Sequence, residues 1–575
     1  MSAQSPQKHV LLLIILFLAI VPYFARLGSS SLWDSNEAFY SETPREMIET
    51  GDLINPSFNY RPRFNKPPLS YWIVLASYKI FGVSESSERI PMALAAVAMM
   101  LTAFALARRV FSYEAGLMAA IALAASPRFL MFSRRIFIDV YLATFLSLAL
   151  LFFLIAAAAE RNSLPKKRRI FFLLMYVSVG LGVLTKGPVA LLLPALTLAA
   201  ILAFERSLTL LRKMMLPGGA GIIALIVLPW YLALYWEHGI GYIASFLLDD
   251  NISRYAQTAW GPSRGFFFYI RVLLGDLFPW SLFLAAAILS PILIRARALR
   301  KPDEADHGAE PEKFGRLTLL AWIGVIVLFF SLSKSKEDLY ILPVYPACAA
   351  LIGGVISSKT GSWFKSRIGL VTPAACLAGL IMALIGAALI YALSKSAADY
   401  RIAGATAAAM VALAGGAIVL AAASLGRSFL SIAAMAGSMI AINWLIALRG
   451  LPDFERFKAV RPFCEIIKRN APTDAKVGYY RFPSPSMVFY LRRPIFELGD
   501  DDHDRRELNS LFLSGHPVFC LMTDETYEET RRTLRVQTYV LASRPAFQVK
   551  LKTVLDGVEP PRILLISNMN GIELN

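Results

Sequence analysis

Apolar runs of about twenty residues, long enough to cross a bilayer as helices, alternate with polar stretches along most of the chain. The pattern predicts about thirteen transmembrane helices, at roughly 10–27, 89–107, 114–130, 138–159, 170–185, 188–204, 215–236, 266–294, 316–333, 338–356, 370–393, 402–424 and 429–448. The first run lacks a small-residue cleavage site, so we expect an uncleaved signal anchor. An odd number of spans places the two termini on opposite sides of the membrane.

The polar stretch 28–88 is a long loop between the first two predicted spans. A loop of this length is usually functional or disordered. Residues 37–49 have helical spacing, and the sequence LSYWIVLASYKIFG at 69–82 has an apolar face with aromatic residues, which is typical of an interfacial helix. These patterns predict an ordered first loop.

The pattern changes after residue 449, which predicts a membrane domain at 1–449 and an α/β domain at 450–575. Four runs rich in β-branched and aromatic residues predict strands: AKVGYYR, HPVFCLMT, FQVKLKTVL and RILLISN. Residues 461–470 and 525–534 have helical patterns between them. Cys464 and Cys520 lie in this domain and could pair outside the cytoplasm, but two buried free thiols are the favoured interpretation.

Composition excludes an ordinary soluble enzyme, because 56% of the residues are hydrophobic, 17% are charged and the mean hydropathy is +0.54. The net charge of +17 would suggest a nucleic-acid partner in a soluble protein. Here much of it lies in short loops between spans, as the positive-inside rule expects. We therefore predict contacts with membrane lipids and phosphate-bearing substrates, and no nucleic-acid partner.

Orientation follows from the basic residues of alternate loops, which share one side with the N-terminus if the chain has thirteen spans. That side is predicted to be cytoplasmic. The loops 28–88 and 237–265 and the C-terminal domain would then face outward. Six basic residues lie on the outer side against this rule. Snorkelling explains one such residue as well as function does, but six together favour an anionic ligand: Arg134, Arg135, Lys186, Arg254, Lys334 and Lys336.

Acidic residues near span ends are the other candidates for chemistry. Asp34 and Glu37 follow the first span, and Asp139 begins another span. For Asp139, a salt bridge to Arg134 or Arg135 is about as plausible as a catalytic role. Lys66 precedes two prolines that fix an extended segment, which suits an ammonium presented to a phosphate.

The first loop resembles that of the GT-C glycosyltransferases, in particular the bacterial aminoarabinose transferases and protein mannosyltransferases. That group has W-D-x-D-E-x-x-Y-x-E-x-x-R-E-M, then G-D-W, then F-x-K-P-P-L-x-Y-W. The matching residues are Trp33, Asp34, Glu37, Tyr40, Glu42, Arg45, Glu46, Met47, Gly51, Asp52, Phe64, Lys66, Pro67, Pro68, Leu69, Tyr71 and Trp72. Further matches are GLGVLTKGPVALLLP (180–194), NISRYA (251–256) and SKSKEDLYILPVYP (333–346). The resemblance therefore covers nearly the whole chain.

The resemblance implies a GT-C type membrane domain with a C-terminal extracytoplasmic α/β domain, located in the bacterial inner membrane. It implies inverting transfer of an aminoarabinose-like sugar from undecaprenyl phosphate to lipid A on the periplasmic side. The catalytic residues would be Asp34, Asn36, Glu37 and Asp139. The substrate-binding residues would be Tyr40, Arg45, Lys66, Arg134, Arg135, Lys186, Arg254, Lys334, Lys336 and Tyr340. The bases would stabilise the leaving phosphate, and carboxylates would stabilise the oxocarbenium-like sugar.

The chain departs from the family at Asn36, where an acid is expected, and an amide cannot accept a proton as a base. Asp34 could act instead, or an ionised phosphate acceptor would need no base; an engineered or silent variant is a further alternative. The family's histidines in the 237–265 loop are also missing, and no metal site is predicted, although carboxylates could hold a divalent cation. The rival functions are a protein O-glycosyltransferase and a polyprenyl-linked substrate transporter.

Overall fold

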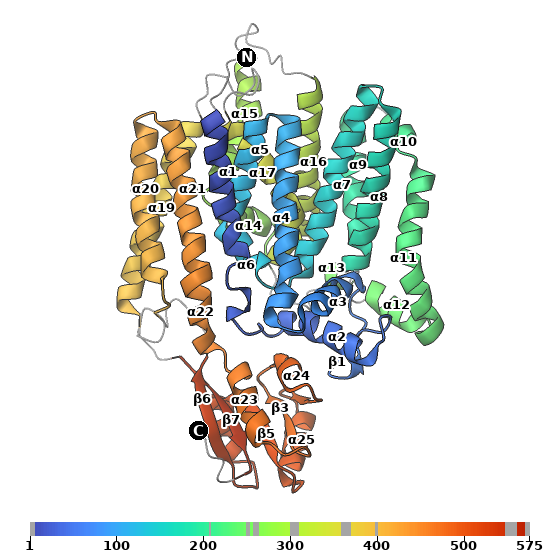
Figure 1. The fold of residues 1–575 in the computed structure, drawn as a ribbon, viewed down its shortest axis with the longest axis vertical. Helices are drawn as coiled ribbons and strands as arrows, with labels where there is room; N and C mark the ends of the chain where they lie inside the picture. Colours follow the sequence, from blue (N-terminus) through green and yellow to red (C-terminus); the bar gives the residue numbers. More distant parts are fainter. Residues whose placement is uncertain are drawn as a thin grey trace.

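The computed structural model describes residues 6–205, 209–248, 253–256, 264–298, 310–357, 370–396, 401–546 and 560–569. A body of roughly parallel and antiparallel helices carries a small α/β domain at one end, and the first loop lies between the two (Figure 1). This arrangement agrees with the predicted fold class. It places the first loop where both parts of the chain can contact it.

Ten helices in the described residues are long and apolar enough to span a membrane, and the bent pair α5–α6, with an angle of 68°, would make eleven. The sequence predicts about thirteen spans, so the described residues contain two or three fewer; α3 (Leu69–Phe81) and α9 (Val189–Glu205) are shorter apolar helices. The helices of the body are α1 (Pro6–Ile20), α4 (Glu85–Val110), α5 (Tyr113–Ala124), α6 (Pro127–Ser133), α7 (Ile138–Arg161), α8 (Pro165–Lys186), α9 (Val189–Glu205), α10 (Thr209–Lys213), α11 (Leu216–His238), α12 (Ile240–Leu247), α13 (Arg254–Ala256), α14 (Phe268–Asp276), α15 (Ser281–Ala298), α16 (Glu310–Leu332), η5 (Asp338–Val344), α17 (Tyr345–Ile356), α19 (Val371–Lys395), α20 (Ala405–Ser424) and α21 (Ser428–Leu445).

Small residues allow neighbouring helices to pack closely. A Cβ at Gly353 of α17 would lie 2.2 Å from the Ala115 carbonyl oxygen of α5, and a Cβ at Gly416 of α20 would lie 2.4 Å from the Ala383 nitrogen of α19. Close backbone approach of this kind is a common source of helix association in membranes, where van der Waals packing replaces the hydrophobic effect. These contacts fix the scaffold that carries the loops.

The first loop forms short elements and two helices, as the sequence predicts. The loop is preceded by η1 (Val21–Tyr23) at the end of the first span. Its own elements are η2 (Leu27–Ser29), α2 (Asn36–Thr50), the antiparallel pair β1 (Ser57–Phe58) and β2 (Arg61–Pro62), and α3 (Leu69–Phe81). Ten residues of α2 are buried, including four charged ones. Buried charges require partners, so α2 is attached by ion pairs rather than by an apolar face alone.

The last long helix of the body continues past α21 through η7 (Ile446–Gly450), α22 (Leu451–Asp453) and η8 (Phe454–Phe457). The predicted domain boundary at residue 449 falls inside this helical connection. The connection therefore carries the chain directly from the body into the C-terminal domain (Figure 1).

The C-terminal domain contains a five-stranded sheet with the order β4-β3-β5-β7-β6. The strand β3 pairs in parallel with β4 and β5, whereas β7 is antiparallel to β5 and β6. The predicted strand FQVKLKTVL lies outside the described residues, and Cys464 and Cys520 are buried free thiols. The elements are α23 (Val460–Asn470), β3 (Lys476–Tyr480), α24 (Ser486–Leu491), β4 (Phe496–Leu498), α25 (Asp502–Leu513), β5 (Val518–Thr523), α26 (Asp524–Arg531), β6 (Tyr539–Pro545) and β7 (Arg562–Ser567).

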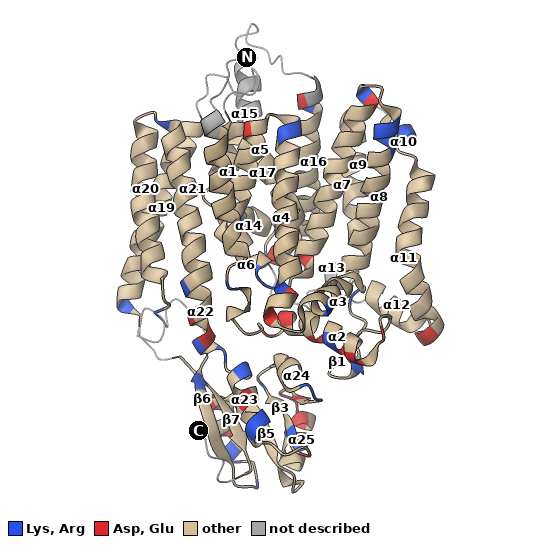
Figure 2. Ribbon diagram, in the orientation of Figure 1, with Lys and Arg blue, Asp and Glu red and all other residues tan. Residues whose placement is uncertain are grey.

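Charged residues gather at the two ends of the helical body, and its middle is almost free of them (Figure 2). The C-terminal domain and the first loop lie at one end, and the start of α1 lies at the other (Figure 1). The basic residues that the positive-inside rule assigns to the N-terminal side include the last turns of α4, α7 and α10, which lie at that end. These basic residues therefore lie at the end of the body away from the C-terminal domain (Figure 2).

Candidate functional site

The carboxylate of Asp34 contacts the C-terminal domain. It accepts hydrogen bonds from the Ser486 backbone N–H and from the Ser486 hydroxyl, each 2.7 Å long. Asp34 keeps access to solvent, but protein surrounds it and this burial raises the pKa of its carboxyl to about 6. The Ser486 hydrogen bonds and the charge of Lys458 act in the opposite direction. The pKa of Asp34 therefore lies above the ordinary value of an aspartate.

Trp33 connects the first loop to two cations. The Arg135 guanidinium lies 3.9 Å from the centroid of the indole, and the Lys458 ammonium lies 4.0 Å from it. The ring also stacks on Phe454, with centroids 5.0 Å apart. Cations over an indole are attracted by its negative face, so Trp33 holds two positive charges beside Asp34.

Glu37 is buried and forms a bidentate ion pair with Arg89 of α4. Its two oxygens accept from Arg89 Nε and Nη2 at 2.8 Å, and one also accepts from the Trp33 backbone N–H at 2.9 Å. Burial raises the pKa of Glu37, but the Arg89 charge and hydrogen bonds outweigh it and hold that pKa below its ordinary value. Glu37 is thus an ionised carboxylate that positions the loop, and its oxygens are already in use.

The pKa of Lys458 depends on burial and on the charges of Glu37 and Arg89. Burial lowers its pKa to about 7, the Glu37 carboxylate raises it, and the nearby Arg89 lowers it again. Its ammonium donates to the Ser30 hydroxyl at 2.8 Å. Burial also lowers the pKa of Arg134 and Arg135 to about 10, which leaves both protonated at neutral pH. Three basic residues, Arg134, Arg135 and Lys458, therefore contact the first loop or the segment before it.

The predicted acid Asp139 pairs with Lys186, in a contact between the first turn of α7 and the last residue of α8. The sequence-based alternative, a salt bridge to Arg134 or Arg135, is therefore wrong about the partner. Arg134 instead donates to the carbonyls of Pro22 and Arg26. The Lys186 ammonium also lies 4.6 Å from the ring centroid of Tyr340. Three predicted residues from distant motifs thus meet at one point.

The segment 333–340 supplies the remaining predicted bases. Lys334 is exposed, whereas Lys336 is buried and donates to the Ser333 carbonyl. Burial lowers the pKa of Lys336. Arg128 and Arg264 hold the segment by ion pairs to Asp338, at 2.9 and 3.2 Å. The loop is therefore fixed from two sides, and Lys334 is its most accessible cation.

Lys66, in the first loop, contacts the helical body: its ammonium lies 5.8 Å from the ring centroid of Phe246 in α12. The neighbouring Phe64 packs on His238 and Tyr242, with ring centroids 4.9 and 4.3 Å apart. These contacts attach the predicted Lys-Pro-Pro segment to α11 and α12. They place its ammonium beside the apolar helix α12.

Three further residues predicted to bind substrate or to act in catalysis are Arg45, Tyr40 and Asn36, and their contacts are as follows. Arg45 is held within α2 by Glu42 and Glu49, at 2.6 and 2.7 Å. Tyr40 is buried and stacks on Tyr71, with centroids 5.5 Å apart. Both therefore order the loop. Asn36, in contrast, is exposed at the first residue of α2.

Arg254 begins α13, and its side chain lies outside the described part of the chain. Three residues in the site were missed in the sequence analysis: Arg89, Lys458 and Ser486. A signal for Arg89 existed, because an arginine at the start of an apolar span needs a partner. Lys458 and Ser486 come from the C-terminal domain, and no local pattern marks them.

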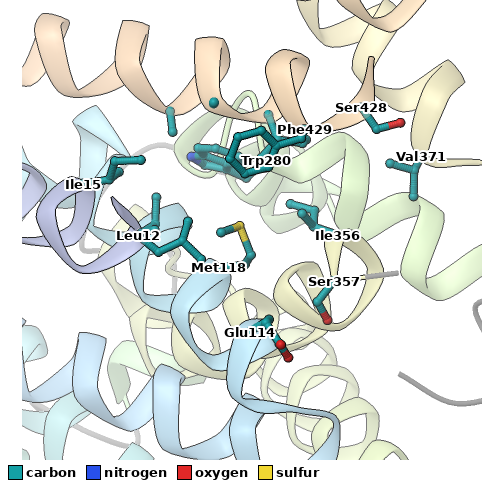
Figure 3. Close-up of a pocket in the computed structure, with 14 residues that line it drawn as sticks. Leu12, Ile15, Glu114, Met118, Trp280, Ile356, Ser357, Val371, Ser428 and Phe429 are labelled. Carbon is teal, nitrogen blue, oxygen red and sulfur yellow. The ribbon is translucent and has the colours of Figure 1, made fainter. Parts of the chain in front are cut away.

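Cavities in the helical body are mostly apolar. Figure 3 shows one of about 240 Å³ at the end opposite the first loop, where Trp280 lies among Leu12, Ile15 and Met118 and only Glu114 adds a charge. A second cavity, of about 150 Å³, lies between α7, α8, α9, α11 and α16. Its walls are almost entirely apolar side chains, so it fits hydrocarbon and not a sugar.

One cluster in the described residues has metal-ligating side chains within reach of each other: Asp501, His503 and Asp504. Asp501 accepts from the Asp504 backbone N–H at 2.7 Å as the N-cap of α25, and Asp504 accepts from the Gly499 N–H at 2.6 Å. These hydrogen bonds explain the cluster as a helix cap.

Comparison with known proteins bears on the fold and on the family. Residues 65–236 match a family model described as dolichyl-phosphate-mannose-protein mannosyltransferase. A crystal structure of ArnT from Cupriavidus metallidurans in the apo state superposes with a TM-score of 0.77, 22% sequence identity and coverage of 99% of this chain and 100% of that one. The chain has the fold of the GT-C glycosyltransferases.

Two relatives in sequence agree with this assignment. An uncharacterized protein of Aquifex aeolicus is 29% identical over 60% of this chain and 64% of its own length. The undecaprenyl phosphate-alpha-4-amino-4-deoxy-L-arabinose arabinosyl transferase of Pectobacterium carotovorum is 27% identical over 64% of this chain and 65% of its own. The chain thus matches slightly less than two thirds of the length of these relatives. A second ArnT structure, bound to undecaprenyl phosphate, superposes with a TM-score of 0.76.

Proposed function

We propose that the protein transfers an aminoarabinose-like sugar from undecaprenyl phosphate to lipid A, as an inverting glycosyltransferase. The observation that carries the proposal is the Asp139–Lys186 pair beside Tyr340, formed at one end of a GT-C body by three separate motifs. The arabinosyl transferase names of the relatives support the donor. The reaction breaks the bond between the anomeric carbon and the phosphate oxygen while an acceptor oxygen bonds to that carbon.

The donor phosphate requires cations close to an apolar path for its polyprenyl chain. Lys186 ends α8, and Val179, which lines the 150 Å³ apolar cavity, lies seven residues before it on the same helix. At 1.5 Å per residue that is about 10 Å. A phosphate at Lys186 would therefore have hydrocarbon-lined space within reach of its lipid chain. The negative charge that develops on the leaving phosphate would be stabilised by Lys186.

The acids have separate roles in this proposal. Asp139 lies against the donor-binding lysine, where a carboxylate stabilises positive charge on the departing sugar. Asp34 is the candidate base, because its pKa near 6 suits proton acceptance. Asn36 lies two residues away and is exposed, so its amide can donate to the acceptor. Glu37 is proposed as a positioning residue, through Arg89 and the Trp33 backbone.

The acceptor decides whether a base is needed at all. A phosphate of lipid A is already ionised and needs positioning more than deprotonation, and the cations Arg135 and Lys458 beside Trp33 could position it. A protein hydroxyl would need Asp34 as a base. The mannosyltransferase description of the matching family model favours this second candidate, protein O-glycosylation.

One experiment separates these alternatives. The purified protein is incubated with undecaprenyl-phosphate aminoarabinose and either lipid A or a serine-containing peptide, and products are identified by mass spectrometry. Sugar on lipid A supports the proposal, and sugar on the peptide alone would replace it by the second candidate. Asp139→Asn should abolish product, whereas Asp502→Asn, an exposed acid of the C-terminal domain, should not. No product with any acceptor would exclude both functions, and Asn36→Asp tests whether the amide limits the rate.

We also propose that the first loop and the C-terminal domain face the periplasm. The separation of basic residues between the two ends supports this orientation. Ser514 is exposed in the C-terminal domain, and three of the four native cysteines are buried. Ser514→Cys should therefore react with a membrane-impermeant maleimide in intact spheroplasts, while Ser163→Cys, at the other end, should react only after lysis. The reverse pattern would overturn the orientation.

A further inference from the structure

A basic cavity lies at the end of the helical body opposite the C-terminal domain. It has a volume of about 530 Å³ and lies between the ends of α4 and α7 and the start of α16. Three arginines line it: Arg108 and Arg109 at the end of α4, and Arg161 at the end of α7. No carboxylate is among its described lining residues. Three guanidinium groups around one cavity provide a site for an anion.

Aromatic and backbone contacts hold the arginines in place. The Arg161 guanidinium lies 4.1 Å from the ring centroid of Phe314, and that of Arg108 lies 5.7 Å from the ring centroid of Tyr113. Arg109 Nε donates to the Leu154 carbonyl at 3.4 Å. Side chains oriented in this way lose less conformational entropy when a ligand binds. Solvated loop arginines, which the positive-inside rule alone would explain, do not need such contacts.

The nearest acid in sequence is engaged elsewhere. Glu160, directly before Arg161, forms ion pairs with Arg168 and with Lys213, the latter at 3.8 Å. These contacts tie α7 to α8 and α10. The positive charge of the cavity is therefore left without a carboxylate from its own helix end.

The deeper walls of the cavity are apolar. Phe104, Leu151 and Ile155 contribute hydrocarbon from α4 and α7. Gly315 lets α16 approach α4 beneath them, since a Cβ there would lie 2.7 Å from Val110 Cγ2. A ligand for this cavity must combine an anionic group with an apolar body, which a free ion does not.

We propose that this cavity binds the anionic phosphate head group of a membrane lipid. The phosphodiester contacts Arg108, Arg109 and Arg161, and the upper part of an acyl chain lies against Phe104 and Ile155. Basic pockets between transmembrane helices are suited to anionic lipids, and each arginine near the membrane surface contributes a binding factor of about fivefold. The site is separate from the proposed transferase site and does not depend on that function.

Native mass spectrometry of the full chain, transferred into mixed micelles, tests the proposal. The probes are phosphatidylglycerol and phosphatidylcholine with identical acyl chains. The wild type should retain phosphatidylglycerol several-fold more than phosphatidylcholine. Arg161→Gln should reduce the preference about fivefold. Arg161→Lys should retain most of it, because the charge remains. The matched control is Arg169→Gln, which removes an exposed arginine of α8 at the same end but outside the cavity.

The outcomes separate the possible occupants. Equal retention of the two lipids by the wild type, or an equal loss in Arg161→Gln and Arg169→Gln, would overturn the proposal. Displacement of phosphatidylglycerol by inorganic phosphate would show a site for a small anion instead. Displacement by a synthetic peptide of residues 301–313, which carries five acids, would assign the cavity to the chain's own linker. A thermal midpoint equal to the wild type confirms that Arg161→Gln is folded.

Discussion

Asp34 and Ser486 are 452 residues apart in the chain and are joined by two hydrogen bonds of 2.7 Å. The candidate base of the first loop is thus held by the first residue of a helix in the C-terminal domain. Arg461 and Glu85 add an ion pair of 3.1 Å between the same two regions. The C-terminal domain is therefore joined to the first loop by direct polar contacts.

Removing the Ser486 hydroxyl should change the titration of Asp34. Its hydrogen bonds lower the pKa of Asp34, which burial otherwise raises. Ser486→Ala should therefore raise that pKa above its value of about 6, and activity should begin to fall at a higher pH on acidification. The measurement is kcat/KM against pH. Ser514→Ala, an exposed serine of the same domain, should leave the acid limb in place; an unmoved limb in Ser486→Ala would show that Asp34 does not set it.

With a hydroxyl acceptor, which needs a base, the activity of the wild type should show a bell-shaped pH dependence. Asp34, with its raised pKa of about 6, becomes protonated and loses its basic form below that pH. Lys458, with its lowered pKa of about 7, becomes neutral above that pH. Both groups are charged together only in the narrow interval between these values. Lys458→Met should remove the alkaline limb, and Lys468→Met, at an exposed position of α23, should not. A flat profile between pH 5 and 8 would contradict this assignment.

Breaking the Glu37–Arg89 pair should destabilise the protein, and neither residue is proposed to contact the substrate. Both partners are almost fully buried. Arg89→Met would leave the buried Glu37 carboxylate without its ion-pair partner, which costs about 3–5 kcal/mol. Glu37→Gln should cost less, because Arg89 keeps an ion pair with Glu88 at 3.4 Å. The double change Glu37→Gln/Arg89→Met should cost less than the sum of the two. Thermal unfolding in detergent measures this. Glu507→Gln, at an exposed position, is the control, and additive losses would argue against direct coupling.

The Asp139–Lys186 pair should behave as one unit in catalysis. Lys186→Met should lower kcat/KM by about 10²-fold or more, because a cation facing the leaving phosphate is lost. Asp139→Asn in addition should have little further effect. The control is Lys79→Met, at an exposed position of α3. Independent, multiplicative losses in the double variant would show that the two residues act at separate steps.

Local patterns predicted much of the architecture. The helix at 37–49, the interfacial helix at 69–82 and the strands around Val477, Phe519 and Leu564 all form. The strand β4 was missed because it has only three residues, and β6 because it carries a serine, an arginine and a proline. A segment that forms a strand because it pairs with neighbouring strands, and not because of its own residue pattern, cannot be recognised from its sequence.

The sequence by itself determined which segments are apolar enough to cross a membrane, which end carries each set of basic residues, and which residues match the family motifs. Burial of hydrocarbon and the cost of burying charge act along each segment, so they are visible in composition and spacing. Only the tertiary structure decided the partners: Lys186 for Asp139, Arg89 for Glu37 and Ser486 for Asp34. An ion pair or hydrogen bond depends on distances of about 3 Å between atoms of residues that are distant in the chain, 452 positions for Asp34 and Ser486. Such distances are set by packing.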